Sequence, residues 1–149
     1  EKAFLKAQLA AGIQLPQRGA VFISIKDSDK NTLIIEAATI LRKLGFNILA
    51  TKGTSNFLNK NDIETTPINK VFEGRPNILD LLKDSRITLV FNTTEGTRSI
   101  EDSKGIRSIA LKKKIPYFTT AAGCNAAALA IDVKINKEMA VYKIQDLIK

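Results

Sequence analysis

Hydrophobic positions along this chain alternate between short continuous runs and longer stretches with helical spacing. Residues 20–25, AVFISI, are mostly apolar and rich in β-branched side chains, which predicts a buried strand. In residues 27–45 the apolar positions recur every three or four residues, which predicts an amphipathic helix. We expect Asp29 to be the N-cap of this helix and Gly45 to follow its last turn. This part of the chain therefore reads as a strand followed by a helix.

The same alternation continues toward the C-terminus. Further strands are predicted at 46–50, 65–69, 87–91 and 116–119, and further helices at 54–61, 77–84, 99–114, 121–132 and 137–149. The strand that contains Pro67 is expected at a sheet edge or a strand start, because proline lacks the N–H that a ladder needs. Strands separated by helices of this length are typical of βαβ units. The predicted fold class is therefore α/β, a three-layer α/β/α domain with a mainly parallel, Rossmann-like sheet of about five strands.

The composition narrows the chemistry that this chain can perform. It has 149 residues, about the size of one domain, of which 44% are hydrophobic and 26% charged, as in ordinary soluble globular proteins. Histidine is absent and Cys124 is the only cysteine, so a zinc site, an internal disulfide and a histidine-dependent catalytic set are excluded. A single cysteine also fits a reducing, cytoplasmic location. No apolar run approaches the roughly 20 residues that a membrane span needs, so we expect no membrane partner.

The formal net charge of +8 has two interpretations, an anionic partner or an ordinary lysine-rich surface. Nucleic acid is one candidate, but the lysines are scattered, and residues 112–114 close a predicted helix, where cations complement the helix dipole. The chain has no tryptophan and only two tyrosines, so a stacking surface for single strands is poorly supplied. The pattern favours a small anionic ligand over nucleic acid.

The first residues differ from the alternating pattern. The chain starts with glutamate rather than methionine, and residues 1–12, EKAFLKAQLAAG, read as the end of a helix already under way. We therefore expect residues 1–18 to be a linker and helix that lead in from the preceding body of a longer polypeptide. Residues 19–149 are expected to form the domain itself.

Polar or positively charged residues follow the first four predicted strands. In an open parallel sheet the ligand lies beyond the carboxyl ends of the strands, so these loops are expected to meet at one edge. The residues concerned are Ser24, Lys26, Asp29 and Lys30 after the first strand, Thr51, Lys52, Gly53 and Thr54 after the second, Asn69, Lys70, Gly74 and Arg75 after the third, and Asn92, Thr93 and Thr94 after the fourth. Four such loops at one edge predict an anion pocket.

The stretch LATKGTSNFL, which contains the second of these loops, has clear phosphate-binding character. Gly53 allows close approach of the backbone, and the N–H groups of Thr54 and Ser55 are expected to open a helix whose positive end faces the ligand. The hydroxyls of Thr51 and Thr54 add donors, and lysines in the neighbouring loops add positive charge. Thr54 is also the expected N-cap of that helix.

Catalysis would need a poised carboxylate or nucleophile at the same edge. The available carboxylates are Asp29, Glu73, Glu95, Glu101 and Asp102. Each has an ordinary alternative as a helix cap or a solvated charge, and Glu101 and Asp102 fall in the expected first turn of a helix, where the dipole favours them. Without histidine, Ser24 and Cys124 have only lysine left as an activating base. We predict no catalytic residues and no metal ligands in this chain.

Four stretches of the sequence carry specific motifs. They are GAVFISIKDSDK, GFNILATKGTSNFL, NKVFEGRPNILDLL and VFNTTEGTRSIEDSKGIRSIALKKKIPYFTT. The motifs T-x-G-T, N-K-V-x-E-G-R-P and N-T-T-x-G…I-E-D-S…I-R are specific in combination, whereas T-x-G-T alone is weak. In this order they resemble the C-terminal regulatory domain of the carbamoyl phosphate synthetase large subunit, a domain of the methylglyoxal-synthase-like fold. The resemblance runs from about Lys2 to about Asp132, and KAFLKAQLAAG is similar to the segment that leads into that domain.

This resemblance implies a regulatory function. In bacterial members the domain binds nucleotide effectors through their phosphate, with uridine monophosphate as inhibitor and inosine monophosphate as activator. The effector-binding residues carried onto this chain are Ser24, Lys30, Thr51, Gly53, Thr54, Lys70, Asn92, Thr93 and Thr94. Ornithine activates some members from the boundary with the synthetase body, and Tyr117 and Thr119 match family positions implicated there.

The resemblance also implies a parent enzyme with cofactors and partners of its own. The parent is an ATP-dependent ligase that makes carbamoyl phosphate for pyrimidine and arginine synthesis in the cytoplasm. It would use ATP, magnesium or manganese, and potassium, whereas this domain itself would need no cofactor. The implied partners are the rest of the large subunit, the small glutaminase subunit and, through this domain, a second copy of the enzyme.

Two alternatives stay open: a stand-alone phosphate-ligand enzyme of the same fold, and a basic nucleic-acid-binding domain. Methylglyoxal synthase has Gly-Asp where this chain has Gly74-Arg75 and relies on histidines, and an arginine cannot act as a base at neutral pH. The chain also departs from the regulatory domains it resembles. Lys52 stands where histidine is frequent, and Thr97-Arg98 stands where two arginines are frequent. The identity of the effector and the sign of its effect therefore stay open.

Overall fold

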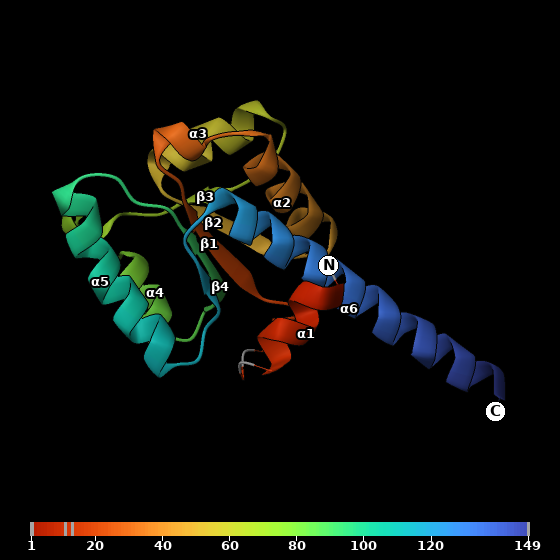
Figure 1. The fold of residues 1–149 in the computed structure, drawn as a ribbon. Coiled ribbons are helices and arrows are strands. Elements are labelled where there is room, and N and C mark those ends of the chain that lie inside the picture. The colour runs from red at the N-terminus through yellow and green to blue at the C-terminus, as the bar shows by residue number, and fades with distance from the viewer. Residues whose placement is uncertain (1, 11, 13, 149) are drawn as a thin grey trace.

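The computed structural model describes residues 2–10, 12 and 14–148, so predictions for residues 1, 11, 13 and 149 lie outside it. A five-stranded parallel sheet has helices packed on both faces (Figure 1). The strands are β1 (Ala20–Ser24), β2 (Asn47–Ala50), β3 (Thr66–Pro67), β4 (Ile87–Asn92) and β5 (Tyr117–Phe118). The helices are α1 (Lys2–Ala10), α2 (Thr32–Lys43), α3 (Lys52–Lys60), α4 (Ile78–Lys83), α5 (Thr97–Lys112) and α6 (Ala121–Ile148), with 3-10 turns η1 (Asp27–Asp29) and η2 (Val71–Glu73). The predicted three-layer α/β fold is confirmed.

The order of the strands in the sheet is β3-β2-β1-β4-β5, and all neighbours are parallel. From β1 the chain moves outward to β2 and β3, and then returns to the other side of β1 for β4 and β5. The order therefore reverses between β1 and β4, and the loops that follow these two strands diverge there. β3 lies at the edge, as expected for the strand that contains Pro67, and it pairs only with Leu49 and Ala50 of β2.

Each face of the sheet has its own hydrophobic core. Val21 and Ile23 of β1 belong to the core that α2 and α6 cover, whereas Phe22 belongs to the core beneath α4 and α5 (Figure 1). None of these three side chains is more than 1% exposed. Because both faces of β1 and β4 are covered, their sequences read as nearly continuous apolar runs rather than as alternating ones.

The two closing helices predicted at 121–132 and 137–149 are in fact one helix, α6. The prediction of two helices was wrong because residues 133–136, Val-Lys-Ile-Asn, contain no glycine or proline that would end a helix. The first half of α6 is buried against α2, whereas its second half extends beyond the sheet with exposed side chains (Figure 1).

Helix α2 begins two residues later than its predicted cap implied. Asn31 is the N-cap, and its Oδ1 accepts the N–H of Leu33 at 3.0 Å. Asp29 lies in the η1 turn instead, where its carboxylate is 3.7 Å from Lys26 Nζ. The C-terminal prediction is confirmed, because Gly45 follows the last turn with a φ of 92°, which glycine adopts readily.

Helix α5 begins earlier than predicted, directly after Gly96. Glu101 and Asp102 therefore lie beyond its first turn, and the expectation that they compensate the helix dipole there was wrong. Neither Thr97 nor Arg98 is a helix-breaking residue, so the helix can begin at Thr97 rather than at residue 99.

The predicted lead-in segment packs against the domain. Helix α1 lies along α6, and the ring centroids of Phe4 and Phe118 are 6.0 Å apart. Leu15 is 2% exposed within the core beneath α2 and α6, and its carbonyl accepts a hydrogen bond from Lys134 Nζ at 3.0 Å. The domain boundary at residue 18 stays a prediction.

Candidate functional site

Loops at the carboxyl edge of the sheet line two adjoining hollows. Their volumes are about 290 Å³ and about 240 Å³, and Ser24, Thr51 and Lys70 line both. They lie where the strand order reverses between β1 and β4, the usual place for a ligand in an open parallel sheet. We call the larger one the polar hollow. The smaller one also has polar side chains, but we call it the apolar hollow because a group of large apolar side chains lines it: Phe22, Val71, Phe72, Ile78 and Ile106.

Hydroxyl groups line the polar hollow. Thr54 Oγ1 accepts the N–H of Ile25 at 2.9 Å, and Thr51 Oγ1 donates to Ser24 Oγ at 3.2 Å. Thr93 Oγ1 accepts a backbone N–H of the loop after β1 at 2.9 Å. The three threonines are each at most 3% exposed. These bonds connect the loops that follow β1, β2 and β4, and they orient the hydroxyls before any ligand arrives.

Three lysines, Lys26, Lys30 and Lys70, line the polar hollow and outnumber its two carboxylates, Asp27 and Glu95. Lys30 Nζ lies 2.6 Å from Asp27 Oδ1, and its side chain is 19% exposed. The hydrogen bond and charge of Lys30 hold the pKa of the Asp27 carboxyl below its usual range, and Lys70 adds to this lowering. Gly53 makes room for Lys30, because a Cβ on this glycine would lie 3.3 Å from Lys30 Nζ. Any larger residue would crowd the ammonium group.

The N-terminus of α3 meets the polar hollow through Gly53 and Thr54. Thr51 is the N-cap of this helix, and the N–H of Ser55 donates to the Thr51 carbonyl at 2.7 Å. The N–H groups ahead of the intrahelical bonds therefore belong to Lys52, Gly53 and Thr54. The prediction that Thr54 caps the helix was wrong, and so was the prediction that Ser55 presents its N–H, which is bonded to Thr51. The predicted N–H of Thr54 does lie ahead of the intrahelical bonds. The Thr54 hydroxyl is instead engaged by the loop after β1.

The apolar hollow lies between β1, α5 and the η2 turn. Phe72 of that turn is 47% exposed, and the Arg98 guanidinium lies 4.0 Å from the centroid of its ring. Burial raises the pKa of the Asp102 carboxyl, and the charges of Arg98 and Lys70 oppose this rise. The lining comprises Phe22, Ser24, Thr51, Lys70, Val71, Phe72, Ile78, Asn92, Glu95, Arg98, Ser99, Asp102, Ser103 and Ile106. The two hollows together match a ligand with a phosphate at one end and a weakly polar ring at the other.

Sequence reasoning missed the apolar hollow, above all the contributions of Phe72 and Arg98. A signal was present in α5, where Ser99, Asp102 and Ile106 recur at helical spacing and so share one face. The sequence alone does not show which face of α5 turns toward the strand ends. The tertiary packing of α5 against α4 and the sheet decides that.

The structure brings the predicted effector residues together at the two hollows, with the exception of Thr94. Thr94 is half-buried and lines neither hollow. Asn92 lines the apolar hollow, and its Nδ2 donates to Ser103 Oγ at 2.9 Å and to the Tyr117 hydroxyl at 2.7 Å. Tyr117, which was predicted on the ornithine side, therefore contacts Asn92, one of the predicted effector residues. Thr119 is exposed and lines neither hollow.

Two basic residues that the sequence singled out form ion pairs outside the hollows. Lys52 Nζ lies 3.5 Å from Glu73 Oε2, and the Arg75 guanidinium pairs with the Asp80 carboxylate. The Arg75 hydrogen bond lowers the pKa of Asp80. Glu73 also accepts the N–H of Lys70 through Oε1 at 2.9 Å. Lys52 thus supports the turn that carries Lys70, while Arg75 is directed toward α4.

The groups that could support covalent chemistry are poorly placed for it. Cys124 is fully buried in the core, and burial raises the pKa of its thiol to about 12. Ser24 Oγ accepts a hydrogen bond from Thr51 rather than donating to a base. Over residues 2–10, 12 and 14–148, no three carboxylate or thiol side chains are grouped so as to hold a metal ion. No helix in that same part of the chain is long and apolar enough to cross a membrane.

Comparison with known proteins identifies the family. A model of the MGS-like domain matches residues 33–119, more than half of the chain. The chain belongs to the MGS-like domain family. The matched residues of this MGS-like domain run from α2 to β5 and include most of the lining of both hollows, whereas Ser24 and Lys30 precede them. The methylglyoxal-synthase-like domain that the motifs implied is therefore confirmed.

Similar proteins are large chains of carbamoyl phosphate synthase. That of Rhizobium meliloti (strain 1021) is 49% identical over 129 residues, which are 87% of this chain and 11% of that protein. That of Brucella suis biovar 1 is 45% identical over 144 residues, 97% of this chain and 12% of that protein. The large chain, C-terminal section, of Methanopyrus kandleri is 44% identical over 148 residues, 99% of this chain and 27% of that protein. The chain thus spans a small part of the length of these relatives.

Proposed function

We propose that this MGS-like domain is the allosteric, effector-binding part of a carbamoyl phosphate synthase large chain, and that it binds a nucleoside monophosphate. Uridine and inosine monophosphate are the candidate effectors. The observation that carries the proposal is the junction of a cationic, hydroxyl-lined hollow with an apolar one at the point where the strand order reverses. A nucleoside monophosphate has the same division, with an anionic end and a flat, weakly polar ring.

The phosphate binds in the polar hollow. It accepts hydrogen bonds from the first N–H groups of α3, where the positive end of the helix dipole adds to the attraction. The hydroxyls of Thr51 and Thr54 lie beside these N–H groups, and the Lys30 and Lys70 ammonium groups flank them. Hydrogen bonds to charged groups are worth about 1.5–3 kcal/mol each, so a few of them suffice for micromolar binding.

The ring binds in the apolar hollow, next to Phe72 and Arg98. Asp102 and Ser103 of α5 are among the polar side chains that line this hollow, and in this proposal they discriminate among rings by which ring atoms donate and which accept. The effector acts on the parent enzyme only through a difference in affinity between two arrangements of the whole protein, typically about 1–3 kcal/mol of coupling.

The domain itself performs no catalysis in this proposal. The parent is an ATP-dependent ligase of pyrimidine and arginine synthesis in the cytoplasm, with ATP, magnesium or manganese, and potassium as its cofactors. Its partners are the rest of the large subunit, the small glutaminase subunit and a second copy of the enzyme. Tyr117 and Thr119 are the residues through which ornithine would act at the boundary with the synthetase body.

Titration calorimetry with uridine monophosphate, inosine monophosphate and inorganic phosphate tests the proposed site. Thr51→Ala, Thr54→Ala and Lys30→Ala should each weaken nucleotide binding by about 1.5–3 kcal/mol. Lys60→Ala, at the far end of α3, serves as the charge-matched control and should bind the nucleotide as tightly as the unsubstituted domain does. Urea unfolding of the same variants separates a lost contact from a lost fold. Unchanged affinity in all three site variants would refute the assignment.

Two assays separate the rival functions. The domain should convert no dihydroxyacetone phosphate to methylglyoxal; turnover that disappears in Glu73→Gln or Asp102→Asn would establish the enzyme instead. A nucleic-acid-binding domain would prefer long polynucleotides over mononucleotides and would lose affinity steeply with salt.

A further inference from the structure

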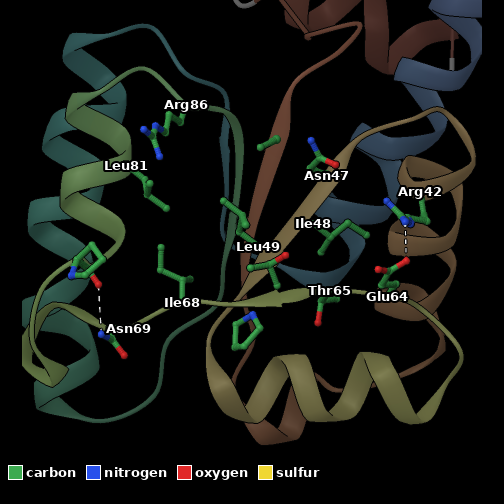
Figure 2. Close-up of a pocket in the computed structure, with 14 residues that line it drawn as sticks. Arg42, Asn47, Ile48, Leu49, Glu64, Thr65, Ile68, Asn69, Leu81 and Arg86 are labelled. Carbon is green, nitrogen blue, oxygen red and sulfur yellow. Dashed lines mark hydrogen bonds and ion pairs between the residues drawn. The ribbon is translucent and has the colours of Figure 1, made fainter.

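A third hollow lies along the edge of the sheet, away from the two that bind the proposed effector. Its volume is about 670 Å³, and it shares no lining residue with the polar or the apolar hollow. Figure 2 shows it between α4 on one side and the end of α2 on the other, with β2 and β3 between them. We call it the edge groove. It is independent of the proposed effector site.

The edge groove exists because β3 is too short to cover β2. β3 pairs with Leu49 and Ala50 only, so Asn47 and Ile48 have no partner strand on that side among the described strands. The N–H of Asn47 donates toward β1, to the Gly19 carbonyl at 3.1 Å. Backbone groups alternate in direction along a strand, so the N–H of Ile48 points to the open side. Ile48 directly precedes Leu49, the first residue of β2 that pairs with β3.

The walls of the edge groove are apolar next to this open strand. Leu49 of β2, Ile68 after β3 and Leu81 of α4 are only partly buried, and all three pack at the margin of the core beneath α4 and α5. Figure 2 shows their side chains in the space between α4 and β2. An open strand edge beside partly exposed apolar side chains is a template for pairing with another chain.

Arginine side chains lie on both sides of the edge groove. Arg42 of α2 pairs with Glu64 at 2.8 Å, so its charge is compensated (Figure 2). Arg86, between α4 and β4, is exposed and forms no ion pair within the described part of the chain. The groove therefore carries net positive charge, with Arg86 as the group available to an incoming carboxylate.

We propose that the edge groove binds an extended segment of a partner protein as an added strand beside Asn47 and Ile48. An apolar side chain of that segment packs on Leu49 and Leu81, and a neighbouring carboxylate pairs with Arg86. An extended segment fits better than a helix because its backbone carbonyls are unpaired along its whole length, whereas a helix leaves only its last four carbonyls without an internal partner. Strand addition of this kind takes its affinity from backbone hydrogen bonds and its selectivity from side-chain pockets.

A pair of labelled peptides tests the charge preference by fluorescence anisotropy. The first is acetyl-Ser-Val-Asp-Val-Thr-Val-amide, and the second carries Lys in place of Asp. The acidic peptide should bind the full 149-residue chain at least about fivefold more tightly than the lysine peptide. Arg86→Glu should abolish that difference, whereas Lys112→Glu, the same charge change at the exposed end of α5, should leave it intact. Equal binding of both peptides to the parent chain would overturn the proposal.

Amide hydrogen exchange tests the geometry. Saturation with the acidic peptide should slow exchange of the Ile48 N–H by about tenfold or more while the amides of α6 stay unchanged. Binding without protection of Ile48 would overturn strand addition. Protection that grows with protein concentration in the absence of peptide would assign the groove to a second copy of the chain instead. Displacement of the peptide by inorganic phosphate would assign it to a small anion.

Discussion

Lys52 Nζ lies 3.5 Å from Glu73 Oε2, and this ion pair joins the first turn of α3 to the η2 turn. The other carboxylate oxygen of Glu73 accepts the N–H of Lys70 at 2.9 Å. Glu73 therefore links the start of α3 to the backbone of a residue whose side chain lines both hollows. Lys52 lines neither hollow itself, and its ion pair supports the turn that carries Lys70.

Glu73→Gln should weaken nucleoside monophosphate binding by about two- to fivefold. The substitution removes the ion pair with Lys52 and so holds the backbone of Lys70 less firmly, but the Lys70 side chain itself is kept. The free energy of unfolding should change by less than about 1 kcal/mol, since the ion pair is partly exposed to solvent. Calorimetry and urea unfolding measure the two effects. Glu101→Gln removes a comparable exposed pair with Lys104 and is the control. An affinity equal to that of the control would show that the pair does not position Lys70.

Gly53→Ala should separate binding from stability. The added Cβ would lie 3.3 Å from Lys30 Nζ, so the ammonium group must shift, and phosphate binding should fall by about five- to tenfold. Gly53 lies in the first turn of α3, where alanine favours the helix, so the free energy of unfolding should stay equal or rise by up to about 1 kcal/mol. Gly105→Ala in α5 is the control, because its Cβ would meet Leu79 at an ordinary 3.6 Å. Full phosphate affinity in Gly53→Ala would contradict the role given to Lys30.

Tyr117→Phe removes the hydroxyl that accepts from Asn92 Nδ2 at 2.7 Å. Asn92 keeps its bond to Ser103, so the expected loss of unfolding free energy is about 0.5–1.5 kcal/mol, measured by urea titration. Effector affinity should also fall, because Asn92 lines the apolar hollow. Tyr142→Phe on the exposed half of α6 should change neither quantity, since Tyr142 is 66% exposed. A loss of stability with no loss of affinity would make this hydrogen bond purely structural.

Cys124 should be unreactive in the folded protein at pH 8, because its thiol is buried and its pKa is raised to about 12. Ellman's reagent should label it only after unfolding. In the unfolded chain the thiol ionises near its ordinary pKa of about 8.5, so above that pH the native state holds a proton that the unfolded state has lost. The free energy of unfolding should therefore fall as the pH rises from about 8.5 toward 12.

The control for this pH dependence is Cys124→Ala, which carries every other titrating group of the chain. The difference in unfolding free energy between the unsubstituted chain and Cys124→Ala should shrink between pH 8 and pH 10. A constant difference would mean that the thiol titrates alike in both states. Rapid labelling at pH 8 without denaturant would contradict the burial of Cys124 directly.

Local sequence patterns predict those elements that a continuous apolar run or a terminating glycine marks clearly. β1 and β4 are apolar on both faces, and Gly45 ends α2 where a left-handed residue is needed. Helix starts are less certain, because several residues in a row can cap a helix. Asn31 rather than Asp29 begins α2, and Thr51 rather than Thr54 begins α3. In the second case a contact distant in sequence, between Thr54 and Ile25, decides the outcome.

The sequence by itself determined the α/β fold, the parallel sheet and the polar loops at the carboxyl ends of its strands, because these depend on periodicity and residue type within short windows. The motifs that resemble regulatory domains of carbamoyl phosphate synthetase are also continuous in sequence. Only the tertiary structure decided that Phe72 and Arg98 form part of the wall of the apolar hollow, that Lys52 supports Lys70 through Glu73, and that the N–H of Ile48 has no partner strand on the β3 side among the described strands. Each of these relationships joins residues from different elements, and their distances depend on how helices and strands pack rather than on their local sequence.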